Sequence, residues 1–282
     1  MVLLHSLDAL REWQQKSNWS SKSIGFVPTM GALHDGHASL IRTAVAQCDL
    51  VVVSILVNPT QFNESSDFDS YPRTLESDAQ KAQAAGADAV FAPSAVDLYG
   101  GTPAAPSVDW GALTSAYEGA HRPGHFDGVV AVVDLLFDAV QPKVAVFGEK
   151  DLQQVAVVKR LAKERHPEVH VVVGSLIRDA HGLALSSRNS RLSPEGLRTA
   201  LSLNRCLRAV DEAVGSGDTV ELALGRSRAD LESLAGVELE YLDVVDGQTF
   251  EPAHGPSHPH RHVVVAAHVE GVRLIDNVPL RT

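Results

Sequence analysis

The alternation of short apolar runs with segments of helical periodicity most constrains how this chain can fold. The runs are rich in β-branched residues, as in strands that are covered on both faces of a parallel sheet. They lie at residues 23–27, 50–57, 144–148 and 169–175. Segments with helical spacing lie between them, at residues 37–48, 128–140 and 151–165. This order predicts an α/β fold with a doubly wound, Rossmann-like parallel sheet.

The pattern changes after residue 189. Ser193 and Pro194 are typical of a helix start, and a helix rich in Leu and Ala follows them. A break at residues 215–218 precedes a second helix, and residues 238–246 and 262–269 are predicted to be antiparallel strands. We therefore predict a Rossmann-like domain at residues 1–176 and a smaller C-terminal α+β domain at residues 177–282.

Composition limits the kind of partner. A chain of 282 residues, 44% of them hydrophobic, lies near the length at which one core gives way to two. The formal net charge of −11 argues against a nucleic-acid partner, because such binding needs clustered Lys and Arg. Cys48 and Cys206 are expected to be reduced core thiols. The first residues contain neither a signal peptide nor a membrane span, so we expect a cytoplasmic protein with no membrane partner and small-molecule ligands.

The loop at residues 28–37 joins a predicted strand to a predicted helix. Amides at a helix start lack partners within the helix, so an anionic phosphate is a suitable ligand there. Gly31 and Gly36 allow the backbone to approach a ligand closely. His34 and His37 are three residues apart and could both donate hydrogen bonds to one phosphate. The alternative is two solvated loop histidines, and the strand–loop–helix context favours nucleotide binding.

Two other segments follow predicted strands, at residues 58–62 and 148–154. Ligands of doubly wound sheets bind at the carboxyl ends of the strands. We therefore predict that these segments and the loop at 28–37 converge on one crevice. The polar stretch that begins at residue 58 is long for a connection, which favours an active-site loop.

Five motifs in one order carry a family resemblance. The sequence His34-Asp35-Gly36-His37 resembles the His-x-Gly-His motif of the nucleotidylyl transferase superfamily, and VPTMGALHDGH is similar to the corresponding string of the pantoate–β-alanine ligase family. The other motifs are VNPTQF at 57–62, YPRT at 71–74, RPGHF at 122–126 with FGEKDLQQ at 147–154, and GLALSSRN at 182–189.

The resemblance implies an AMP-forming ligase that makes a C–N amide bond. Pantoate would attack the α-phosphate of ATP and release pyrophosphate, and β-alanine would then attack the pantoyl adenylate to give pantothenate and AMP. ATP is thus a substrate, Mg²⁺ is the implied cofactor, and the partners are pantoate, β-alanine and a second copy in a homodimer. In this scheme the first domain binds ATP and pantoate, and the second carries the phosphate-binding loop at its start.

The resemblance also implies roles for individual residues. His34, His37, Lys150 and Arg188 are the expected catalytic residues. Gln61 and Gln154 are expected to bind pantoate, and Gln61 also faces β-alanine. The expected ATP-binding residues are Met30, Gly31, Ala32, Leu33, His34, Asp35, Gly36, His37, Gly148, Glu149, Lys150, Asp151, Ile177, Leu185, Ser186, Ser187 and Arg188.

Each role has a simpler alternative. Gln154 could be a solvent-facing helix residue, Lys150 could form a surface ion pair with Glu149 or Asp151, and Arg188 alone could be a surface arginine. Asp78 is the candidate metal ligand, with Ser77 where a second acid would be found, and its alternative is an acid on a helix surface. The histidines at 254, 258, 260 and 262 could bind a transition metal adventitiously, but a turn before a strand is the better interpretation.

The chain departs from the family at Ser175, where relatives commonly have proline before the aliphatic contact, here Ile177. The main functional alternative is another nucleotidylyl transferase with the same loop. Gln61 and Gln154 argue against it, because a phosphorylated acceptor would require more Arg and Lys. A short, acidic chain disfavours an aminoacyl-tRNA synthetase. A protein that binds ATP without turnover has little need for His34, His37, Lys150 and Arg188 together.

Overall fold

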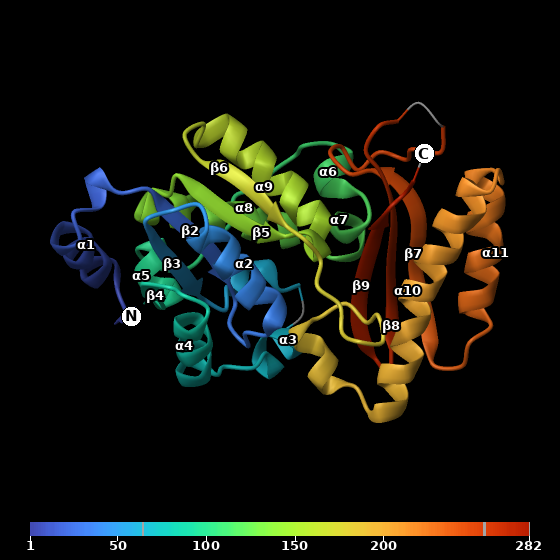
Figure 1. Cartoon of the computed structure of the whole chain (residues 1–282), viewed down its shortest axis with the longest axis horizontal. Helices are drawn as coiled ribbons and strands as arrows, with labels where there is room; N and C mark the ends of the chain where they lie inside the picture. Colours follow the sequence, from blue (N-terminus) through green and yellow to red (C-terminus); the bar gives the residue numbers. More distant parts are fainter. Residues whose placement is uncertain (64, 256–257, 282) are drawn as a thin grey trace.

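A six-stranded parallel sheet forms the N-terminal part of the computed structural model, which describes residues 1–63, 65–255 and 258–281 (Figure 1). Its strand order is β1-β4-β3-β2-β5-β6, and all of its pairings are parallel. The strands are β1 (Val2–Leu4), β2 (Ile24–Thr29), β3 (Leu50–Ile55), β4 (Ala89–Phe91), β5 (Val144–Gly148) and β6 (His170–Gly174). Because β2 lies between β3 and β5, the chain order reverses there, which is where such sheets bind ligands. The predicted sheet is confirmed.

Helices cover both faces of this sheet. On one face α2 (Asp35–Val45) and α4 (Leu75–Ala84) pack through Ile41 and Ala82 against alternate strand residues such as Val53. The other face is covered by α1 (Leu7–Lys16), α8 (His125–Val140) and α9 (Leu152–Arg165). Short helices connect these layers, at α3 (Ser65–Ser70), α5 (Ala95–Tyr99), α6 (Ala112–Ser115) and α7 (Glu118–His121). The sheet is therefore doubly wound, as the sequence predicts.

An antiparallel sheet in the C-terminal part has its own hydrophobic core. Its strands, in spatial order, are β7 (Val237–Asp246), β8 (Arg261–Val269) and β9 (Val272–Pro279). The helices α10 (Pro194–Gly215) and α11 (Val220–Glu232) pack against it, and Figure 1 shows them side by side. Ser193 caps α10 by accepting a hydrogen bond from the Gly196 amide, as its sequence predicts. A division after residue 176 stays a prediction, with which this second core is compatible.

Some elements differ from the prediction. The strand β9 was not predicted, although the turn at Glu270 and Gly271 has positive φ at both residues, which suits a two-residue hairpin. The stretch predicted as an irregular loop contains α3 and a 3-10 turn at Pro59–Gln61. Pro256 and Ser257 of the histidine-rich run lie outside the described residues. No helix within the described ranges is both long and apolar enough to span a bilayer.

Candidate active site

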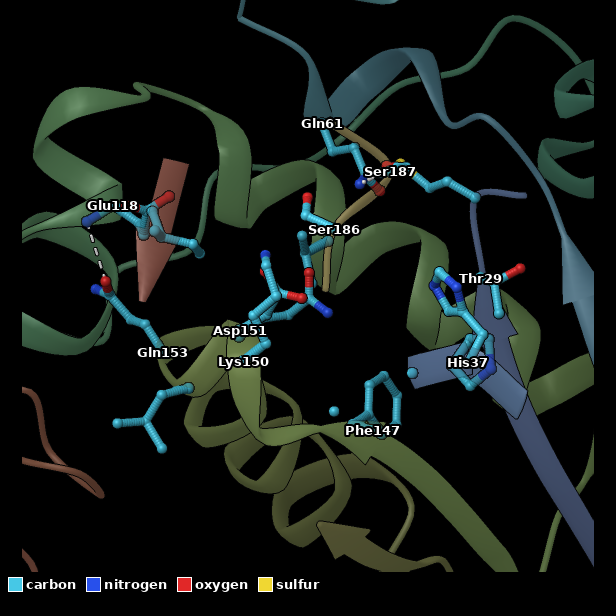
Figure 2. Close-up of a pocket in the computed structure, with 18 of the residues that line it drawn as sticks. Thr29, His37, Gln61, Glu118, Phe147, Lys150, Asp151, Gln153, Ser186 and Ser187 are labelled. Atoms are coloured by element: carbon cyan, nitrogen blue, oxygen red, sulfur yellow. Dashed lines mark hydrogen bonds and ion pairs between the residues drawn. The ribbon is translucent and has the colours of Figure 1, made fainter. Parts of the chain in front are cut away.

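One cavity lies at the carboxyl ends of β2, β3 and β5 and is closed on another side by the C-terminal part. Figure 2 shows His37, Gln61, Lys150, Ser186 and Ser187 facing it from segments that are far apart in the sequence. The three loops predicted to converge do so here, and that prediction is confirmed.

The histidine-bearing loop has a strained start that a buried acid holds in place. Gly31 and Ala32 both have positive φ, of +86° and +49°, which is costly for alanine. The Asp78 carboxylate accepts hydrogen bonds from the amides of Ala32 (2.8 Å) and Leu33 (2.7 Å). Lys81 donates to the Leu33 carbonyl at 2.7 Å. The first two turns of α4 therefore clamp this loop by its backbone.

This geometry gives Asp78 a role that the sequence did not predict. Its side chain is 0% exposed, so the alternative of a surface acid is wrong. Both carboxylate oxygens accept amide hydrogen bonds, one of them also accepts from the Thr74 hydroxyl, and Asp78 does not line the cavity. Within residues 1–63, 65–255 and 258–281, no group of three or more His, Cys, Asp or Glu side chains could hold a metal ion. A role for Asp78 as a metal ligand is not supported.

The two histidines are held in one tautomer. The His34 amide donates to Nδ1 of His37, and the Gly36 amide donates to Nδ1 of His34. Burial lowers the pKa of His34 to about 4 and that of His37 to about 3, so both rings are neutral near pH 7. A neutral ring whose Nδ1 accepts a bond carries its proton on Nε2. Each ring therefore offers one Nε2–H donor, and the ring centroids are only 4.1 Å apart.

The loop amides are less available to an anion than predicted. The Gly31 amide donates to the Thr29 hydroxyl, and those of Ala32, Leu33, His34 and Gly36 donate to the partners described above. The expectation that this backbone would cradle a phosphate is therefore wrong for these five amides. The side chains of His34 and His37 supply the donors instead.

Lys150 provides a cation at the turn between β5 and α9. Its side chain is 19% exposed, lines the cavity and lies 3.3 Å from Oδ1 of Asp151. Burial, the largest single influence, would raise the pKa of Asp151, but the charge and hydrogen bond of Lys150 together with the charge of Arg188 outweigh it, and the pKa lies below its ordinary value. The predicted alternative, an ion pair with Asp151, thus exists, but it borders the cavity. Figure 2 shows both side chains at the start of α9.

The loop at residues 185–188 brings hydroxyl groups and a guanidinium to the opposite wall. Ser186 accepts a hydrogen bond from the Arg188 amide, and Ser187 lies 3.3 Å from the Tyr71 hydroxyl. Arg188 forms an ion pair with Asp67 of α3 at 2.8 Å, and Arg191 binds the same carboxylate. The segment that follows β3 therefore holds the loop at residues 185–188, for which the resemblance implies phosphate binding.

The Gln61 amide is oriented by its neighbours. Its Oε1 accepts from Nδ2 of Asn58 at 3.2 Å, and its Nε2 lies 2.9 Å from the Met30 sulfur. The Gln61 carbonyl binds Nδ1 of His125 at 2.8 Å, which fixes the backbone. A Cβ on Gly128 would lie 2.3 Å from the Thr60 carbonyl oxygen, so only glycine permits this close approach of α8. The result is an amide whose Nε2 is presented at the cavity.

Most of the predicted site residues meet at this cavity. Those that line it are Met30, His34, Gly36, His37, Gln61, Gly148, Lys150, Asp151, Gln154, Ile177, Leu185, Ser186, Ser187 and Arg188. The predicted residues that do not line it are Gly31, Ala32, Leu33, Asp35, Glu149 and Asp78. Three of these six supply amide donors to loop contacts, and Glu149 instead accepts a hydrogen bond from the Leu176 amide.

Sequence reasoning missed several residues at the cavity. Asn58, Arg122 and His125 were predicted only as parts of motifs, with no role of their own. Glu118 is buried and binds Arg273 of β9, so that burial, which alone would raise its pKa, is outweighed and the pKa falls to about 2. The Arg and His of the RPGHF motif directly precede the apolar segment at 128–140, and this is a sequence signal that could have indicated such contacts. Nothing in the sequence indicated the partner in β9.

The fold and this site together define an α/β protein with an anion-binding cavity at the carboxyl edge of a parallel sheet. Comparison with known proteins is more specific. The family model described as Pantoate-beta-alanine ligase matches residues 2–279. The chain therefore belongs to the pantoate–β-alanine ligase family.

Individual relatives match this chain over most or all of their length. The chain is 45% identical to a pantothenate synthetase from a Nocardioides species, across 99% of this chain and 85% of that protein. It is 41% identical to one from Cytophaga hutchinsonii, across 99% of both. A crystal structure of pantothenate synthetase from Thermus thermophilus has a TM-score of 0.93 at 40% identity, covering 100% of both chains. The Francisella tularensis ligase complexed with β-γ ATP and β-alanine has a TM-score of 0.83 at 32% identity, over 100% of this chain and 98% of that one.

Proposed function

We propose that this protein condenses pantoate with β-alanine to pantothenate at the expense of ATP, through a pantoyl adenylate. In the first step a pantoate carboxylate oxygen attacks the α-phosphorus, and the bond to the β-phosphate oxygen breaks to release pyrophosphate. In the second, the β-alanine nitrogen attacks the acyl carbon, loses a proton, and AMP leaves. The observation that carries this proposal is the meeting of His34, His37, Lys150 and Arg188 at one cavity in a member of this family.

The cationic and hydroxyl side chains stabilise the triphosphate and the charge that develops on it. The Nε2–H groups of His34 and His37 donate to phosphate oxygens without adding charge. Lys150 adds a compact positive charge, and Arg188 adds a forked donor that can bind two oxygens. Because backbone amides hold the two histidine rings before ATP binds, these rings need little reorganisation as the reaction proceeds.

The amide side chains bind pantoate. Oε1 of Gln61 accepts from Asn58 and one Nε2–H donates to the Met30 sulfur, so the second Nε2–H is available to a pantoate oxygen. Gln61 also faces β-alanine, as the family resemblance implies. Gln154 lies on the first turns of α9 and adds a second amide to the same cavity. Amides suit a substrate with two hydroxyl groups and a carboxylate, because they both donate and accept.

Three finer features complete the proposal. ATP enters as its Mg²⁺ complex, since the ATP phosphates can bind Mg²⁺ with few protein ligands and the donor set around Asp78 does not fit a metal. The protein acts as a homodimer in the cytoplasm, as the family resemblance implies. No nucleic acid or membrane takes part.

The test is exchange of labelled pyrophosphate into ATP in the presence of pantoate and the absence of β-alanine, followed by detection of pantothenate when β-alanine is added. Hydroxy acids other than pantoate test the substrate. His37→Ala should lower the exchange rate by roughly 10²-fold, as for loss of a preorganised donor. His170→Ala, on the exposed start of β6, is the matched control and should keep the rate. An active preparation that shows no pantoate-dependent exchange would contradict the adenylate route.

A further inference from the structure

The end of β9 contacts the turn that carries Lys150, although more than 120 residues separate them in sequence. Nδ2 of Asn277 donates hydrogen bonds to the carbonyls of Glu149 (3.0 Å) and Lys150 (3.2 Å). Asn277 is 4% exposed and lines the cavity. We propose that Asn277 is a positioning residue that fixes Lys150 for the adenylation step. This inference rests on the proposed function.

The orientation of the Asn277 amide supports this role. Two carbonyls accept from its nitrogen, so the amide can be placed only one way round. Its Oδ1 is then buried without a partner among the described residues. A buried, unpaired acceptor destabilises a fold and makes asparagine a poor choice for packing alone. The two donated bonds are therefore the contribution of this side chain.

Asp276, the residue before Asn277, connects β9 to the segment at 177–188, which bears Arg188. The backbone N–H of Asn277 donates to Oδ1 of Asp276, and Asp276 forms a bidentate ion pair with Arg178 at 2.7 and 2.9 Å. Arg178 also donates to the carbonyls of Gly182 and Asn277. The chain then returns, and the Leu185 amide donates to the Ile177 carbonyl. The loop that bears Arg188 follows at once.

The Asp276–Asn277 pair therefore joins two parts of the ATP site to one point of the C-terminal sheet. Asn277 holds the turn of Lys150, and Asp276 holds the hairpin at 177–185 through Arg178. Among the described residues, Asn277 is the only side chain that donates to the carbonyls of Glu149 and Lys150. Loss of its amide frees the turn, and a displacement of about 1 Å can lower a rate by roughly 10²-fold.

A double-mutant cycle tests whether Asn277 acts through Lys150. Asn277→Ala, Lys150→Ala and the double variant are compared with the wild-type protein in pantoate-dependent pyrophosphate exchange. We expect Asn277→Ala to lower kcat by about 10- to 10²-fold, with a smaller change in KM for ATP. The double variant should have a kcat within about twofold of that of Lys150→Ala, because the side chain that Asn277 positions is already absent.

Val272→Ala is the matched control for general damage. Val272 is a buried core residue at the other end of β9, and its truncation should lower the melting temperature without lowering kcat. If Asn277→Ala lowers kcat equally with and without Lys150, or leaves kcat unchanged, the inference is wrong. A wild-type protein with no exchange activity would instead contradict the proposed function, so the two failures are distinguishable.

Discussion

Replacing Asp78 by Asn tests whether a buried carboxylate holds the histidine loop. The carboxylate accepts bonds of 2.8 and 2.7 Å from the amides of Ala32 and Leu33. Asparagine keeps one oxygen and turns an NH₂ group toward the other amide. A hydrogen bond to a charged group contributes about 1.5–3 kcal/mol, and a buried amide left unpaired costs about 1–3 kcal/mol. We therefore expect Asp78→Asn to lower the free energy of unfolding by about 3 kcal/mol or more.

Thermal unfolding measures this effect. At about 2–4 °C per kcal/mol for a protein of this size class, the melting temperature should fall by at least roughly 6 °C. The exchange rate should fall as well, by roughly 10²-fold, because Gly31 and Ala32 can leave their positive φ values and shift His34. Melting curves and exchange assays on the same preparation give both numbers.

The matched control is Glu76→Gln. Glu76 is an exposed acid in the same first turn of α4, so its replacement removes the same helix-dipole interaction and leaves the loop amides alone. If the Asp78→Asn variant keeps the melting temperature and the exchange rate of the wild-type protein, Asp78 does not hold the histidine-bearing loop. If the melting temperature of Asp78→Asn is unchanged but the Mg²⁺ concentration needed for exchange differs, Asp78 would instead be a metal ligand.

Two further predictions concern charge. The pKa of His34 is lowered from 6.5 to about 4 and that of His37 to about 3, so below pH 6.5 the unfolded chain binds protons that the folded protein does not. The contribution of these two histidines to the free energy of unfolding should therefore be constant above about pH 7 and decrease from about pH 6.5 down to about pH 3. Melting temperatures that fall equally steeply with pH in a His34→Gln, His37→Gln variant would exclude these two residues as the cause. Asp67→Asn should remove the ion pair that ATP must displace from Arg188 and lower KM for ATP by up to about fivefold, since a partly exposed pair contributes up to about 1 kcal/mol. Asp69→Asn, an exposed neighbour in α3, is its control, and a raised KM in Asp67→Asn would mean that Asp67 orients Arg188 instead.

The sequence predicts the sheet and the meeting of its loops because both follow from local patterns. Continuous β-branched runs predict buried parallel strands, and the carboxyl ends of such strands lie along one edge. The positions of His37, Gln61 and Lys150 at one cavity follow from that rule alone. Asp78 could not be predicted in the same way. An acid in the first turn of a helix is common for reasons of the helix dipole, and no local pattern shows that its oxygens bind amides some 45 residues earlier.

The same limit explains why β9 and its role were missed. Buried strands are recognised by apolar residues, but Asp276 and Asn277 interrupt the apolar pattern of β9 while lying buried themselves. Arg178 pairs with the Asp276 carboxylate, and the carbonyls of the Lys150 turn accept from the Asn277 Nδ2 group. These partners come from distant segments of the chain. A polar pair that conceals a strand from sequence analysis is thus the contact through which the C-terminal sheet reaches the ATP site. In this protein, two polar residues that are unusual in a buried strand, Asp276 and Asn277, form the contacts of the C-terminal sheet with Arg178 and with the turn of Lys150.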